Sequence, residues 1–188
     1  MDFWKQLIDV LGGNLKSQAV QPRLMNLPDL IRYNSAVRGL YLDALAKLPW
    51  AEVVLPRGLS FDSARNVFVH LTVVEDRWVS YILPNRFSEW KDPEFEAYQD
   101  IESLRTYADQ VKANTESFLK SMKATDWNRK ITVPWIPAPN SITVETALSH
   151  MVMEDMIHFG ELSAMFWQMN LQAPYLAFIR YKYKQENP

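Results

Sequence analysis

Apolar residues recur every three or four positions in four long stretches of the chain. The first stretch covers about residues 28–48, the second 62–83, the third 101–123 and the fourth 144–169. This spacing places the apolar side chains of each stretch on one face of a helix. Four amphipathic helices of this length predict an all-α protein built as a four-helix bundle.

Prolines and capping residues mark the ends of these helices. Pro28 suits a first helical turn, and Pro49 stops the first apolar pattern. Residues whose side chains can accept a hydrogen bond from the first turn precede the other three helices. The predicted N-caps are Ser60 or Asp62 for the second helix, Asp100 for the third and Thr143 for the fourth.

The connecting segments contain scattered prolines and few periodic apolar residues. Residues 49–59 and 84–99 are therefore predicted to be loops. Within 124–142, the stretch 131–135 predicts a short extended piece followed by a turn, because the prolines there exclude a helix.

The length of 188 residues predicts a single domain with its own core. Residues 1–26 form an N-terminal extension, in which residues 2–11 predict a short amphipathic helix. Residues 27–170 form the bundle, and the aromatic C-terminal tail, residues 171–188, is expected to pack on it.

The amino-acid composition argues against nucleic acid and membranes as binding partners. The net charge of −2 and the lack of a basic block argue against nucleic acid. No apolar run is long enough for a transmembrane helix, so no membrane partner is expected. The start of the chain does not resemble a signal peptide, and cysteine is absent. These features predict a cytoplasmic protein.

Two of the three histidines lie in one ladder in the fourth helix. His150, Glu154 and His158 are spaced at i, i+4 and i+8, which places them along one helical face. Ala147 and Met151 share this face, so it is predicted to point inward. A buried carboxylate needs a partner, and a divalent metal would use the carboxylate and the imidazoles together.

The third histidine, His70, lies beside the apolar face of the second helix, near Val67 and Val74. Two inward patches on two helices can converge on one ion. The alternative is a core histidine that only forms hydrogen bonds. Two charged residues nearby have similar pairs of interpretations. Glu161 is either a carboxylate supporting the site or a solvated ion-pair partner, and Arg77 either binds an acidic substrate or forms a surface ion pair.

Several segments, together covering roughly residues 28–170, resemble the DinB/YfiT-like family of metal-dependent four-helix-bundle proteins, in the damage-inducible, thiol-transferase superfamily. Residues 33–49 are similar to the family's opening helix, which often ends in Leu-Pro, and are followed by Ser-Phe-Asp-Ser at 60–63. Residues 70–78 contain a histidine, then an acid, then Trp, as in the family's second helix. Residues 150–161 resemble its final helix, which usually reads His-x3-His-x3-His-Arg-Gly-Gln.

The resemblance implies that the metal ligands are His70, Glu154 and His158. His150 matches the first rung of the family's ladder, which is not a typical ligand, and so belongs to the surroundings of the site. The chain departs from the family pattern because Glu154 stands where the family usually has histidine. The Arg and Gln after the last ligand are also replaced, by Phe159 and Glu161.

Two neutral imidazoles and one carboxylate give a divalent ion a site charge of +1, whereas three imidazoles would leave +2. This ligand set suits catalytic zinc, which is the expected metal. Nickel, ferrous iron and manganese are the alternatives.

The resemblance implies a metal-dependent enzyme acting on a small molecule. It would be a transferase that uses a low-molecular-weight thiol, or a hydrolase with Glu161 or hydroxide as base. One alternative is a non-catalytic metal-binding bundle in stress response. Another is a degenerate site in which Glu154 only hydrogen-bonds to a histidine. Family members are often dimers, so a homodimer is expected.

Overall fold

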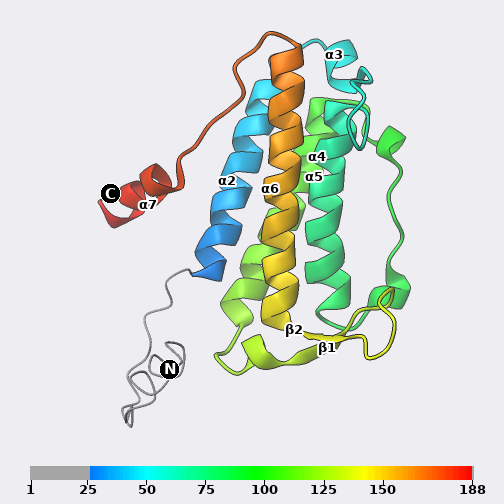
Figure 1. Ribbon diagram of the computed structural model, residues 1–188, viewed down its shortest axis with the longest axis vertical. Helices are drawn as coiled ribbons and strands as arrows, with labels where there is room; N and C mark the ends of the chain where they lie inside the picture. The colour runs from blue at the N-terminus through cyan, green and yellow to red at the C-terminus, as the bar shows by residue number, and fades with distance from the viewer. Residues whose placement is uncertain (1–25, 188) are drawn as a thin grey trace, which may run out of the picture.

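Four long helices lie side by side in the computed structural model, which describes residues 26–187 (Figure 1). They are α2 (Leu27–Leu45), α4 (Ala64–Asp76), α5 (Ile101–Ser121) and α6 (Val144–Gln168). Helices α2 and α4 each pack against both α5 and α6. In the part of the chain that the structure describes, only two three-residue strands are present, so the all-α prediction is confirmed.

The second predicted helix changes its form before it ends. Helix α4 is continued without a break by η1 (Arg77–Ile82), whose hydrogen bonds have π-helical spacing. The amide of Leu83 accordingly donates to the carbonyl oxygen of Trp78, five residues earlier, at 2.9 Å. Such wide turns are frequent at functional sites.

Two of the three helix N-caps predicted from the sequence are present in the structure. Asp100 accepts a hydrogen bond from the amide of Ser103, and Thr143 accepts one from the amide of Thr146, so both predicted caps are confirmed. The cap of α4 is Ser63 rather than Ser60 or Asp62. Asp62 has a left-handed backbone (φ 62°) and belongs to the turn that precedes the helix.

Shorter elements occupy the connections. The prediction of a loop over 49–59 is wrong in part, because α3 (Trp50–Val54) follows directly on Pro49. Proline cannot continue a helix, but it is well tolerated where one begins. The other short elements are the 3-10 helices η2 (Phe87–Glu89), η3 (Phe95–Ala97) and η4 (Asp126–Asn128).

A small antiparallel hairpin precedes α6. Strand β1 (Lys130–Thr132) pairs with β2 (Ser141–Thr143), and Ile131 lies opposite Ile142. The extended piece predicted near 131–135 is therefore confirmed at its start. Its partner strand was not predicted, because three residues directly before a helix contain no alternating pattern.

The core consists of two groups of buried side chains. One includes Tyr41, Phe68, Leu104, Leu162 and Phe166. The other includes Trp78, Ile82, Trp127, Ile131 and Leu148. Each group draws on several of the long helices, so the predicted apolar faces meet in one interior.

A buried ion network links α2, α4 and α6. The guanidinium of Arg38, only 3% exposed, lies 2.7 Å from a carboxylate oxygen of Glu75 and 2.9 Å from one of Asp155. The hydroxyl of Thr115 donates to Glu75. The pKa of Asp155 is raised to about 6, because burial and the neighbouring Glu75 raise it by more than Arg38 lowers it. This network was not predicted from the sequence.

The C-terminal tail carries α7 (Phe178–Glu186), which lies beside α2 in Figure 1. The ring of Tyr33 packs edge-on against Phe178, and its hydroxyl donates to the carbonyl oxygen of Leu176 at 2.6 Å. The ammonium of Lys182 pairs with Asp29 at 2.8 Å. The tail therefore packs on the first long helix, as predicted.

Two further predictions concerned a helix near the N-terminus and the lack of a membrane-spanning helix. The short helix predicted over 2–11 lies outside the described residues. None of the described helices combines the length and the apolar character needed to cross a membrane.

Candidate metal centre

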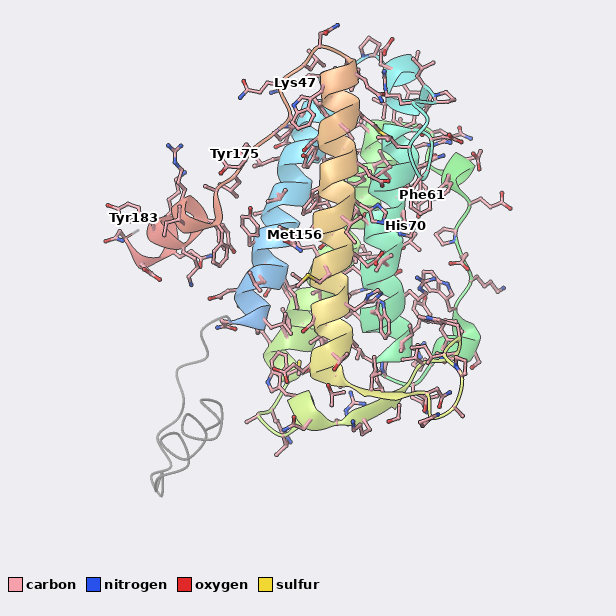
Figure 2. The ribbon with its side chains drawn as sticks, viewed as in Figure 1. Lys47, Phe61, His70, Met156, Tyr175 and Tyr183 are labelled. Carbon is pink, nitrogen blue, oxygen red and sulfur yellow. The ribbon has the colours of Figure 1, made fainter. Side chains whose placement is uncertain are left out.

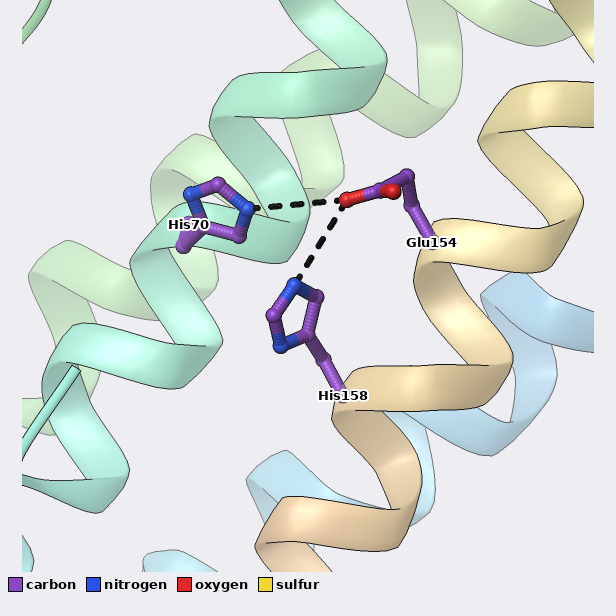
Figure 3. A group of neighbouring side chains, drawn as sticks. All are labelled: His70, Glu154 and His158. Carbon is purple, nitrogen blue, oxygen red and sulfur yellow. Dashed lines mark ion pairs between the residues drawn. The ribbon is translucent and has the colours of Figure 1, made fainter. Parts of the chain in front are cut away.

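Three side chains from two helices converge on one point between α4 and α6 (Figure 3). One carboxylate oxygen of Glu154 lies 3.6 Å from Nε2 of His158 and 3.9 Å from Nε2 of His70. Each residue offers one ligand atom, and the three atoms lie within 4.8 Å of one another. The structure thus brings together the three residues that the sequence proposed as ligands.

The separations fit a shared ion. Ligand atoms at zinc–nitrogen and zinc–oxygen distances lie about 3.3 Å apart in a tetrahedron. The observed separations of 3.6 Å and 3.9 Å from the Glu154 oxygen are somewhat longer than this value. The chemistry of the donors fits as well, because two imidazoles and one carboxylate are a common catalytic zinc set. His70, Glu154 and His158 could therefore hold a metal ion.

Glu161 fixes the orientation of His158. Nδ1 of His158 lies 2.6 Å from a carboxylate oxygen of Glu161. Because an ionised carboxylate can only accept, the N–H at Nδ1 donates this hydrogen bond. This leaves Nε2 as the ring nitrogen available to a metal, and this atom faces Glu154. A histidine held in this way by a carboxylate is the usual arrangement around a metal.

The other oxygen of Glu161 accepts a hydrogen bond from the amide of Ser60 at 3.4 Å. Burial raises the pKa of Glu161, but the hydrogen bonds from Ser60 and His158 outweigh it, and the pKa lies below its ordinary value. Glu161 is therefore ionised at neutral pH. A carboxylate with both oxygens engaged is better placed to orient His158 than to accept a proton from a substrate.

His70 is held in its neutral form. Its pKa is lowered to about 4, because burial and the neighbouring His158 and Arg77 lower it by more than Glu154 and Glu161 raise it. The ring of Phe61 stacks on the imidazole with centroids 4.0 Å apart (Figure 2). A neutral imidazole has a free lone pair, which a metal ligand requires. The contact from Phe61 was not predicted.

His150 does not point inward, and this part of the sequence prediction is wrong. Its side chain is 47% exposed, whereas that of His158 is only 9% exposed. Successive rungs four residues apart rotate about 40° around the helix axis, so the two ends of the ladder differ by about 80°. Nδ1 of His150 lies 3.9 Å from the second oxygen of Glu154, which places it beside the three candidate ligands.

A known protein family matches most of the chain. The family model of the DinB family matches residues 20–187, which is most of the chain. The protein belongs to the DinB family. None of the curated proteins compared with the chain matches it.

The support that Glu161 gives to His158 can be tested by substitution. Glu161→Ala removes the acceptor for Nδ1, and we expect zinc affinity to fall about 10- to 100-fold, as for other carboxylates behind a ligand histidine. Glu161→Gln keeps an acceptor oxygen and should lose less. The measurement is a competition titration with a chromophoric zinc chelator. Glu145→Ala, on an exposed residue of the same helix, is the control. Equal affinity of Glu161→Ala and the wild type would contradict the assignment.

Proposed function

We propose that this DinB-family protein is a metal-dependent enzyme with a four-helix-bundle fold, in which His70, Glu154 and His158 hold a divalent ion. The observation that carries the proposal is the convergence of the Nε2 atoms of His70 and His158 on one oxygen of Glu154. The hydrogen bond from His158 to Glu161 supports it, because it sets the tautomer that a ligand needs.

Zinc is the proposed ion, since two imidazoles and a carboxylate match its ligand preferences at catalytic sites. Nickel, ferrous iron and manganese use the same donor types and are the alternatives. The carboxylate of Glu154 would lower the charge of the loaded site to +1. His150 would remain beside the site, where it is solvent-accessible and close to Glu154.

The proposed reaction is thiol-dependent transfer or hydrolysis on a small molecule. A bound divalent ion supplies Lewis-acid chemistry and lowers the pKa of a thiol or a water molecule. The chain has no cysteine, so a sulfur nucleophile would come from a low-molecular-weight thiol. Glu161 would keep His158 oriented, and Phe61 would shield the ring of His70 from water.

Metal analysis and an activity screen test this function together. Protein purified without a histidine tag should contain about one equivalent of metal and should be stabilised by added zinc. The loaded protein is then assayed with cysteine, glutathione and coenzyme A against an electrophilic bimane, and with activated esters. Protein that takes up no metal would indicate a degenerate site. Metal without turnover would favour a non-catalytic binding protein.

We also propose a homodimer through the outer face of α6. Met153, Met156 and Ile157 lie at helical spacing on this face and are 57%, 53% and 60% exposed. The stripe carries no charge, so two copies can meet across it without repulsion. Ile157→Glu would place two carboxylates in such an interface. We expect the wild type to sediment as a dimer and Ile157→Glu as a monomer, and a wild-type monomer at about 100 μM would contradict the proposal.

A further inference from the structure

The side chain of Arg77 is mostly buried and forms no hydrogen bond within the described residues. Its side chain is 25% exposed, and its Nε atom is buried without a partner. Among the described residues, the guanidinium pairs only with Asp92, whose side chain is 73% exposed, over a long distance of 3.9 Å. Leaving a buried donor without an acceptor is unfavourable. The side chain of Arg77 is therefore suited to an acceptor that is not part of the described chain.

The position of Arg77 connects it with the candidate metal centre. His70 and Arg77 are seven residues apart, so they lie on the same face of the helix, about 10 Å apart along its axis. The two helices run antiparallel: His70 packs on His158 with ring centroids 4.7 Å apart, and Trp78 packs on His150 at 5.6 Å. Arg77 and the three candidate ligands therefore lie along the same α4–α6 contact.

An aromatic surface holds the guanidinium in place. The Cζ atom of Arg77 lies 5.3 Å from the ring centroid of Trp135, whose side chain is half exposed. Trp78 and Phe87 pack on the same indole, at 5.6 Å and 5.7 Å between centroids. Stacking on an aromatic ring engages the face of a guanidinium and leaves its N–H groups free to donate in the plane of the group. Those N–H groups match the two oxygens of a carboxylate.

The charges around Arg77 favour a ligand with a single negative charge. Glu154 and Glu161 lie farther along the same contact between the helices and would repel a doubly charged group such as phosphate. The single positive charge of Arg77 matches the single negative charge of one carboxylate. We propose that Arg77, stacked on Trp135, binds the carboxylate of a small-molecule substrate whose reacting end lies at the His70–Glu154–His158 centre. The second half of this statement rests on the proposed function.

The test uses probes that contact either one or both ends. Acetohydroxamate binds metal alone, and the monohydroxamates of succinic to suberic acid add a carboxylate at increasing distance. Their terminal amides are the uncharged matches. By calorimetry on zinc-loaded protein, at least one chain length should bind about 10-fold tighter as the acid than as the amide, since a charged hydrogen-bonded pair is worth about 1.5–3 kcal/mol.

Variants assign this preference to Arg77. Arg77→Met should bind acid and amide equally while its affinity for acetohydroxamate is unchanged, and Arg77→Lys should retain part of the preference. Asp92→Asn should keep the preference, which separates substrate binding from a surface ion pair. Arg86→Met, on an exposed arginine paired with Glu89, is the matched control. A preference that survives in Arg77→Met would overturn the proposal.

An experiment on metal-free protein distinguishes an error in the proposed metal centre from an error in the proposed carboxylate site. Benzoate should bind the metal-free wild type and lose about 10-fold in affinity in Arg77→Met. If acetohydroxamate fails to bind the zinc-loaded protein but this benzoate result holds, the metal centre is wrong and the carboxylate site stands. If benzoate binding is absent or independent of Arg77, the carboxylate site is wrong. Tighter binding of inorganic phosphate than of benzoate would also overturn it.

Discussion

Replacing His158 by alanine is expected to abolish metal binding, whereas replacing His150 by alanine should leave most of it. His158 is nearly buried, has its tautomer set by Glu161 and directs Nε2 at Glu154. His150 is half exposed and lies 3.9 Å from the other oxygen of Glu154. Its removal takes away a neighbour of the site and leaves the three proposed ligands intact.

Zinc content by elemental analysis and thermal unfolding with added zinc both measure this difference. At a free zinc concentration 100 times the Kd, binding stabilises a protein by about 2.7 kcal/mol. The wild type and His150→Ala should show this shift in Tm, and His158→Ala should show none. Equal loss in the two variants would contradict the ligand assignment. A retained shift in His158→Ala would place the metal elsewhere.

Replacing Arg38 by methionine is expected to lower the free energy of unfolding by about 3–5 kcal/mol, the usual cost of removing one partner from a buried ion pair. The variant leaves Glu75 and Asp155, which are 3% and 7% exposed, without their common cation. Methionine fills much of the same volume, so the loss reflects charge more than packing. Urea unfolding at pH 7 measures it.

Two comparisons separate charge from packing in this network. Arg38→Met combined with Glu75→Gln and Asp155→Asn contains no buried charge and should recover much of the lost stability. Arg105→Met removes a more exposed arginine paired with Asp43 and should cost less than about 1 kcal/mol. A loss below about 1 kcal/mol in Arg38→Met itself would show that the network contributes little.

The long helices could be predicted because packing repeats along them. Apolar side chains every three or four residues must share a face, and Asp100 and Thr143 cap their helices through local hydrogen bonds. The π-helical segment Arg77–Ile82 could not be predicted in this way. One wide turn changes the hydrogen-bond spacing of the backbone, but it leaves the spacing of the apolar residues almost the same as in an α-helix.

The candidate ligands could be proposed from their residue types, but their surroundings could not. His70 and His158 belong to distant parts of the chain, and only the packing of α4 against α6 brings their rings to 4.7 Å. The prediction that His150 faces inward was wrong because it neglected the rotation of about 40° between residues four positions apart on a helix. The ion network of Arg38 was not predicted, because a charged residue is normally assigned to the surface. Its burial depends on Glu75 and Asp155, which are distant in the sequence.

The absence of cysteine gives the exposed methionines of α6 a particular role under oxidising conditions. Met153 and Met156 are more than half exposed and lie on either side of Glu154 in the sequence. Oxidants convert exposed methionine to its sulfoxide, which is polar and reversible by reductases. Such damage would turn an apolar stripe into a polar one beside the candidate metal centre, while the imidazole and carboxylate groups stay chemically unchanged.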